Sequence, residues 1–94
     1  IKLEFASGKG TVLRNDQVSN KKEHASDKTL NADCIRTFVS AVKQLQEEAR
    51  RAGANKVINI ISYYRKKPYS SASLYECHAG GQRVGVALKG DLAR

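Results

Sequence analysis

The sequence predicts an α+β domain, in which one long helix packs on a small, mainly antiparallel β-sheet and one disulfide joins the two. Three observations predict this. An amphipathic stretch fills residues 31–53, β-branched and alternating segments follow over residues 56–92, and the chain has two cysteines. Residues 1–30 are expected to add short strands and a polar loop. A length of 94 residues suits a single domain over residues 1–94.

The helix is expected from about Ala32 to Ala52. Asn31 is a good N-cap, and Gly53 suits the left-handed position that commonly follows a helix. At about 100° per residue one side of this helix is apolar. That side comprises Cys34, Ile35, Phe38, Val39, Ala41, Val42, Leu45 and Ala49. A single apolar stripe predicts that the helix covers one face of the sheet, with Phe38, Val42 and Leu45 at the centre of the contact.

The residues after the helix predict most of the sheet. Val57–Tyr64 is β-branched and aromatic, which indicates a strand, and Pro68 then breaks it. The stretch "SASLYECH" indicates a second extended segment, which the glycines at 80 and 81 interrupt. The stretch "RVGVALKGDL" alternates apolar and other residues and therefore predicts a half-buried strand. Gly85 within it indicates a bulge or a close backbone approach.

The N-terminal third has the weakest pattern. Short strands are plausible at Lys2–Phe5 and Thr11–Arg14. The rest of residues 7–32 is rich in Ser, Asn, Lys and Asp without an apolar period, so a polar loop is expected there.

The cysteines and histidines allow three interpretations. A zinc site needs about four ligands, whereas only Cys77 and His78 are adjacent, and neighbouring strand residues point to opposite faces. A catalytic thiol at Cys34 or Cys77 lacks a recognisable base and orienting group. A disulfide between Cys34, on the apolar helix face, and Cys77, on a segment expected in the sheet, is the favoured interpretation. It implies an oxidising compartment and leaves His78 at the surface or an edge.

The charge indicates an acidic partner. The net charge is +8, and residues 54–94 carry seven Lys and Arg against two acids. Such an excess favours nucleic acid, anionic lipid head groups or an acidic protein face, although solubility alone also explains it. The densest mixture of cations and aromatic residues is a candidate binding patch, with a solvated connection between strands as the alternative. This patch comprises Tyr63, Tyr64, Arg65, Lys66, Lys67 and Tyr69.

Motifs for nucleotides or metals are lacking in the sequence. No GxGxxG, P-loop or HExxH pattern occurs, so neither a cofactor nor an enzymatic activity is predicted. No apolar run is long enough to span a membrane.

Three stretches resemble a known family: "LQEEARRAGANKVINIISYYRKK", "SSASLYECHAG" and "GVALKG". They are similar to a family of small exported proteobacterial proteins often labelled "excinuclease ATPase subunit". The chain has no Walker motif, so this label does not predict ATPase activity. A signal peptide usually precedes members of that family, and an upstream segment removed before Ile1 would fit this pattern.

A more distant resemblance rests on the junction Gly53-Ala54-Asn55-Lys56-Val57. It is similar to the putative heavy-metal-binding domains and to the stress-sensing outer-membrane lipoprotein of the Rcs phosphorelay. The resemblance implies an α+β fold and transfers no active site.

Together these features predict a non-enzymatic, periplasmic or exported domain that binds another cell-envelope component with an acidic surface. Two alternatives stay open: a nucleic-acid-binding module that uses the Tyr63–Tyr69 patch, and a thiol or metal function at Cys34, Cys77 and His78.

Overall fold

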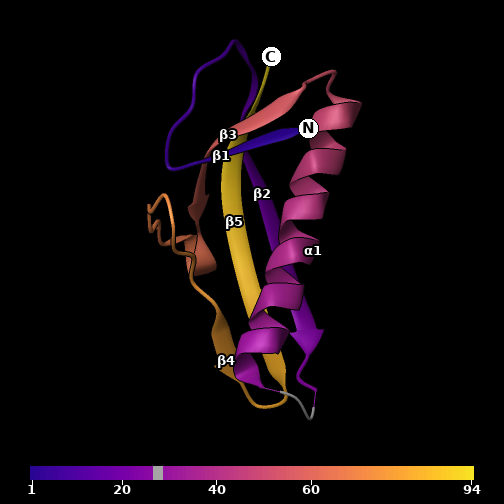
Figure 1. Ribbon diagram of the computed structural model, residues 1–94, viewed down its shortest axis with the longest axis vertical. Coiled ribbons are helices and arrows are strands. Elements are labelled where there is room, and N and C mark those ends of the chain that lie inside the picture. Colours follow the sequence, from indigo (N-terminus) through magenta and orange to yellow (C-terminus); the bar gives the residue numbers. More distant parts are fainter. Residues whose placement is uncertain (27–28) are drawn as a thin grey trace.

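The computed structural model describes residues 1–26 and 29–94, and one long helix lies along a twisted sheet (Figure 1). The helix is α1 (Leu30–Arg51). The strands are β1 (Lys2–Phe5), β2 (Val12–His24), β3 (Lys56–Ser62), β4 (His78–Gly80) and β5 (Arg83–Ala93), and a single 3₁₀ turn, η1, covers Tyr64–Lys66. The predicted α+β class is confirmed. No helix in the described part of the chain is long and apolar enough to cross a membrane.

Strand β5 is the centre of the sheet, whose order is β1-β3-β5-β2. On one edge it pairs antiparallel with β2 from Val12↔Ala93 to His24↔Arg83. On its other edge it pairs antiparallel first with β4 and then with β3. Strand β1 alone is parallel to its neighbour, β3. The sheet is therefore mainly antiparallel, as predicted, and β5 has a partner on both edges over most of its length.

The core lies between α1 and the sheet. Leu45 of the helix is fully buried and packs against β3 and β5. Val42 is also buried, whereas Phe38 is only partly buried at the margin, so the centre of the contact lies one to two turns beyond Phe38. The core cluster comprises Ala41, Val42, Leu45, Ala49, Ala54, Val57, Ile60, Val86, Leu88 and Leu92.

The beginning of the helix differs from the prediction. Thr29, not Asn31, is the N-cap, because its Oγ1 accepts a hydrogen bond from the backbone N–H of Ala32 at 3.2 Å. The apolar stripe is also narrower here: Ile35 is 50% exposed and Val39 is 42% exposed. This end of the helix faces β2, where the buried contacts are polar rather than apolar.

Strand β2 corrects the prediction of a polar loop after Arg14. Its side that faces the helix is held by hydrogen bonds, so it lacks the apolar alternation by which a strand is recognised in a sequence. The Oγ atom of Ser19 is buried and lies 2.8 Å from the carbonyl oxygen of Ala41 and 2.9 Å from Oε1 of Gln44. Partners on the helix thus satisfy polar groups that the sheet buries.

Residues 63–80 are less regular than expected. Strand β3 ends at Ser62 rather than Tyr64, and the segment "SASLYECH" forms no strand before His78. The chain instead leaves the sheet after β3, contacts it once through the bridge between Ser62 and Tyr69, and rejoins it as the short β4. Gly81, with a φ of 59°, then supplies the left-handed residue in the turn to β5, as the predicted interruption at the glycines implied.

Strand β5 is buried on both faces rather than half-buried, and its critical glycine is not Gly85. A Cβ at Gly90 would lie 2.8 Å from Cγ1 of Val57, which is closer than real Cβ atoms approach. A Cβ at Gly85 would make only ordinary contacts, the nearest at 3.5 Å to Tyr64. The close approach predicted for Gly85 therefore occurs at Gly90.

The Leu45→Ala variant tests the position of the core. We expect the free energy of unfolding to fall by about 2–5 kcal/mol, because the side chain is fully buried and its removal leaves a cavity. Ile35→Ala is the matched control and should cost less than about 1 kcal/mol, because half of that side chain is exposed. Urea unfolding measures both. Equal losses would show that the helix packs through a different face.

Candidate binding surface

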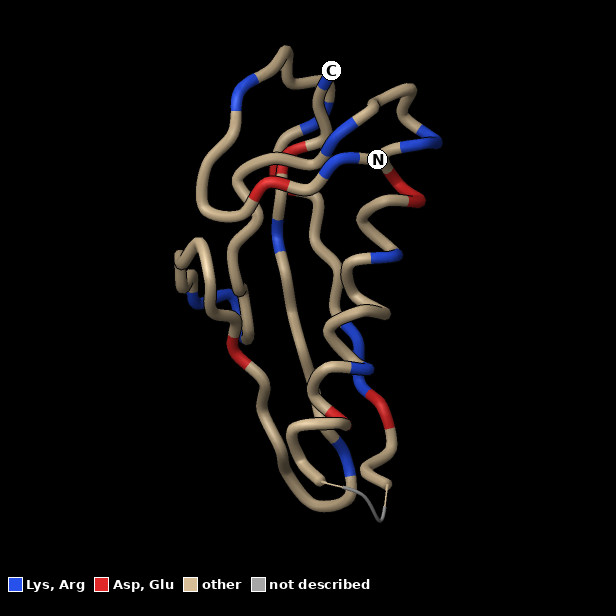
Figure 2. Tube along the Cα trace, in the orientation of Figure 1, with Lys and Arg blue, Asp and Glu red and all other residues tan. Residues whose placement is uncertain are grey.

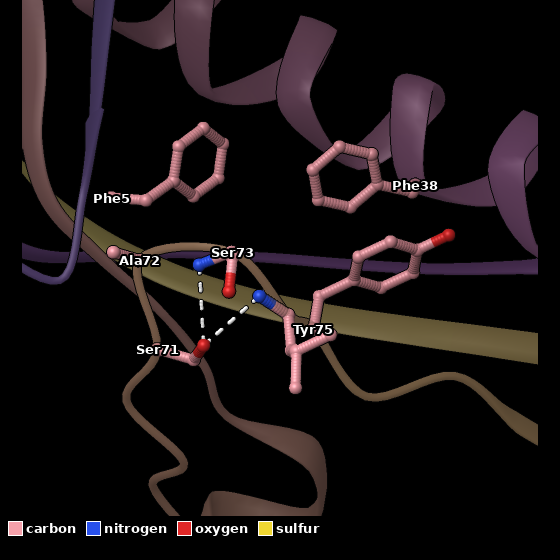
Figure 3. Close-up of a pocket in the computed structure, with 7 residues that line it drawn as sticks. Phe5, Phe38, Ser71, Ala72, Ser73 and Tyr75 are labelled. Atoms are coloured by element: carbon pink, nitrogen blue, oxygen red, sulfur yellow. Dashed lines mark hydrogen bonds between the residues drawn. The ribbon is translucent and has the colours of Figure 1, made fainter.

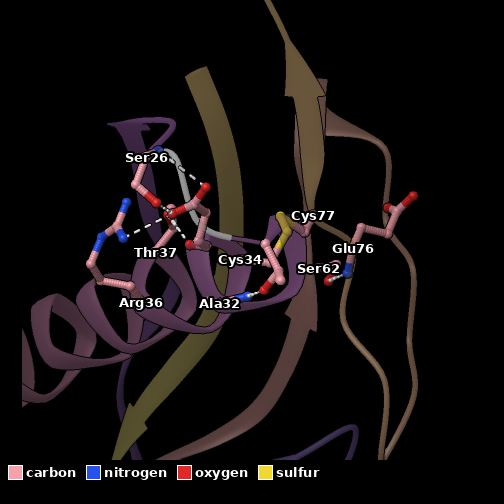
Figure 4. The surroundings of a disulfide bond; sticks show 10 residues. Ser26, Ala32, Cys34, Arg36, Thr37, Ser62, Glu76 and Cys77 are labelled. Carbon is pink, nitrogen blue, oxygen red and sulfur yellow. Dashed lines mark hydrogen bonds and ion pairs between the residues drawn. A yellow bond between two sulfur atoms is a disulfide. The ribbon is translucent and has the colours of Figure 1, made fainter. Parts of the chain in front are cut away.

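A disulfide joins Cys34, the fifth residue of α1, to Cys77, as predicted (Figure 4). Their Cα atoms are 5.9 Å apart and the residues are separated by 43 positions. Because both sulfurs are in the disulfide, neither is a free nucleophile or a thiolate ligand in this oxidised state. Within residues 1–26 and 29–94, no three His, Cys, Asp or Glu side chains gather as a metal site would require.

The disulfide anchors the irregular segment 67–77 at one end, and hydrogen bonds to Ser62 anchor it elsewhere. The backbone groups of Ser62 and Tyr69 exchange two hydrogen bonds, at 3.0 and 2.9 Å. The N–H of Glu76 donates to Oγ of Ser62 at 2.9 Å. Nearer the middle, Oγ of Ser71 accepts from the N–H of Leu74 at 2.9 Å. The segment is therefore fixed to both the helix and β3 without being a strand.

An aromatic hollow of about 200 Å³ lies between this segment and the helix (Figure 3). The ring of Phe38 stacks on Tyr75 with centroids 4.1 Å apart and on Phe5 at 6.0 Å. Burial raises the pKa of the Tyr75 hydroxyl. Leu74, which also lines the hollow, is 64% exposed. This surface is apolar, and no pattern in the sequence indicates it, because its residues come from β1, α1 and the segment 67–77.

A polar network holds the other side of the first helical turn (Figure 4). The Oγ of Ser26 donates to Asp33 at 2.7 Å, and Arg36 donates to Asp33 at 3.0 Å and to Glu23 at 2.9 Å. The hydrogen bond from Ser26, with that from Arg36, lowers the pKa of the Asp33 carboxyl. Hydrogen bonds from Ser40 and then Arg36 lower that of Glu23. Glu23 and Asp33 are therefore both engaged in hydrogen bonds on the helix side of the sheet.

The predicted patch lies on the second face of the sheet, which we define as the face opposite α1. Its turn at residues 64–67 projects from the side of the sheet away from the helix (Figure 2). Tyr63 lies against Lys89, whose Nζ is 4.5 Å from the ring centroid. Tyr64 stacks on His78 at 3.7 Å, with the guanidinium of Arg65 at 5.5 Å from its ring. Three of the six patch residues, Tyr63, Tyr64 and Arg65, therefore take part in these contacts, and the rings of the first two are not free.

The remaining patch residues are more dispersed. Lys66 and Lys67 are exposed at the turn. Tyr69 is 39% exposed, and its backbone is held by Ser62. Arg65 and Lys66 both have left-handed backbone, with φ of 53° and 62°, which is uncommon and unfavourable for residues other than glycine.

Three residues that sequence reasoning did not assign to the patch lie beside it. Lys22 of β2, His78 of β4 and Arg83 of β5 line the same hollow as Tyr64 and Arg65. His78 lies on the edge strand β4, as expected, but it is half-buried and stacks on Tyr64. Only the pairing of Lys22 with Gly85, and of His78 with Gly85 from the other edge, brings these positions together. No spacing in the sequence indicates it.

Comparisons with protein-family models, curated protein sequences and solved structures found no match to this chain. The resemblances to exported proteobacterial proteins, to heavy-metal-binding domains and to the Rcs lipoprotein therefore stay predictions.

Removing the disulfide tests its contribution to stability. We expect Cys34→Ser/Cys77→Ser to lower the free energy of unfolding by about 4 kcal/mol, because a loop of this length is no longer closed in the unfolded chain. Urea unfolding measures the effect, and reduced wild-type protein should match the variant. A titration that found two free thiols in the unreduced, unfolded protein would contradict the pairing.

The Asp33 network predicts a pH dependence of stability. The pKa of Asp33 is lower in the folded protein, so the folded state binds its proton less tightly than the unfolded chain does. The carboxylate therefore stabilises the fold above the ordinary carboxyl range, near pH 4, and this stabilisation is lost as the pH falls through the folded pKa.

The Asp33→Asn variant should accordingly be less stable than wild type at about pH 7, with the difference shrinking toward about pH 2. Urea unfolding across this range measures it. Glu47→Gln is the control, because Glu47 forms only an exposed ion pair with Arg51 and should change stability little at any pH. A constant difference for Asp33→Asn would show that its ionisation is not linked to folding.

Proposed function

We propose that this protein is a non-enzymatic, disulfide-stabilised periplasmic or exported domain that binds an envelope component with an acidic surface. The observation that carries the proposal is the distribution of charge between the two faces. On the helix side, Arg36 pairs with Glu23 and Asp33, and Arg51 pairs with Glu47 and Glu48.

Cations on and around the second face are less compensated. Within the described chain, Lys89 pairs with Asp16 and His78 lies 3.6 Å from Glu76, while five further cations have no ion pair. These five are Lys22, Arg65, Lys66, Lys67 and Arg83. Their concentration on one side gives that side a positive potential, which attracts an acidic partner and speeds its encounter.

The disulfide supports the compartment. Disulfides persist in oxidising environments such as the periplasm or the cell exterior, and a domain of this size gains much of its stability from one.

Nucleic acid is the second candidate, favoured by the tyrosines beside these cations. The contacts of Tyr63 with Lys89 and of Tyr64 with His78 count against it, because stacked bases need free aromatic faces. An acidic protein or envelope surface needs only the charge.

The test is co-sedimentation of the purified, oxidised protein with isolated cell envelopes at about 50 mM and about 200 mM salt. We expect retention at low salt and release at high salt. Lys66→Asn/Lys67→Ser should reduce retention several-fold, whereas Lys43→Ser/Arg50→Ser, which removes the same charge from the exposed helix side, should not. Absence of retention at low salt, or equal losses in both variants, would contradict the proposal.

A single-stranded oligonucleotide in the same salt series separates the second candidate. Nucleic acid would be favoured instead if the protein bound the oligonucleotide more tightly than it bound envelopes, and if the Tyr64→Ala variant bound the oligonucleotide more weakly.

A further inference from the structure

Four elements of the second face surround one hollow, of about 250 Å³. Its polar side chains are Lys22 from β2, Arg65 from η1, His78 from β4 and Arg83 from β5. Tyr64 forms one wall. These residues lie as much as 61 positions apart in the sequence and meet because β2 and β4 pair with the same stretch of β5, Arg83–Gly85, from opposite edges.

The charge in this hollow is uncompensated. No acid is among its lining residues, and Lys22, Arg65 and Arg83 form no ion pair within the described chain. The carboxylate of Glu76 lines the neighbouring hollow and lies 3.6 Å from Nε2 of His78. Three permanent positive charges therefore surround a space that no protein carboxylate enters.

The walls of the hollow are built rather than incidental. Tyr64 stacks on His78 almost in parallel, at 10°, which fixes both rings. Gly85 lies between Tyr64 and Lys22, since a Cβ there would be in ordinary van der Waals contact with both side chains, at 3.5 and 3.6 Å. Arg65 has left-handed backbone, and its guanidinium lies 5.5 Å from the centroid of the Tyr64 ring. Unfavourable backbone of this kind persists only where surrounding contacts impose it.

We infer that this hollow binds a phosphate group carried by the envelope component, so the inference rests on the proposed function and specifies its ligand chemistry. A phosphate monoester carries close to two negative charges near neutral pH, which three cations compensate. Arginine forks match tetrahedral oxyanions with paired N–H donors, and two of the three cations are arginines. A hollow of this size accommodates the phosphate with part of the group that bears it.

The first experiment uses inorganic phosphate, titrated into the oxidised protein at constant ionic strength and followed by amide NMR shifts. We expect saturable shifts confined to the lining positions, namely Lys22, Tyr64, Arg65, His78, Gly80, Arg83, Val84 and Gly85. Scattered shifts that do not saturate would overturn the inference.

Variants then assign the binding to the hollow. Arg65→Asn/Arg83→Ser should weaken phosphate binding at least about tenfold, because each change removes a charge-assisted hydrogen bond. Asn suits the left-handed backbone at position 65. Lys43→Ser/Arg50→Ser removes two charges from the helix side and should leave binding unchanged. Equal weakening in both variants would mean that net charge, not this hollow, binds the anion.

A second arm distinguishes the source of the phosphate. Vesicles that contain a phosphatidic acid expose a phosphate monoester, whereas glycerol phosphate offers the same group in solution. Binding to either, lost in Arg65→Asn/Arg83→Ser, supports the inference, and the tighter ligand indicates a membrane or a soluble source.

Failure here and failure of the proposed function have different signatures. If phosphate does not bind but envelopes still retain the protein through Lys66 and Lys67, the hollow is not the site and the acidic partner stands. If phosphate binds and envelopes do not retain the protein, the site stands without that partner.

Discussion

Strand β5 supports almost everything else in this structure, because every other strand except β1 hydrogen-bonds to it directly and the helix packs across it. Pairing on both edges removes its backbone groups from water, and burial on both faces removes its side chains. Along this strand the packing is tight at Gly90, since Val57 and Ile60 pack where its side chain would be. The elements around this enclosed strand are held to the rest of the fold by different interactions.

The two long elements beside β5 are held to the helix by different forces. The contact with β3 is apolar and centres on Leu45, whereas the contact with β2 includes Ser19, Glu23 and their hydrogen-bond partners on the helix. Such polar contacts stabilise only when all their groups are satisfied, and at Ser19 and Glu23 they are. The segment 67–77 forms little regular structure of its own, and the disulfide links it covalently to the helix.

The same arrangement separates the chemistry of the two faces. On the helix side, acids pair with arginines. The aromatic hollow of Phe5, Phe38 and Tyr75 lies between the helix and the segment 67–77. The second face gathers cations, because strand pairing brings Lys22, Arg65 and Arg83 together around a hollow that no acid in the described part of the chain lines. Cations gathered in this way repel one another, which lowers the stability of the fold. A ligand of opposite charge neutralises them and removes this repulsion.

The sequence by itself determined the long helix, the strands around Val57 and Val86 and the pairing of Cys34 with Cys77, because each follows from local apolar periodicity or from a count of cysteines. It determined only part of the candidate site, since Tyr64 and Arg65 lie in one short stretch that is rich in cations and aromatic residues. Tertiary structure alone decided that β2 continues as a strand beyond Arg14, because its buried groups there, such as Ser19, are polar and find their partners on the helix. It also decided that Lys22 and Arg83 join Arg65, since the register of β5 brings together residues whose separation along the chain carries no signal.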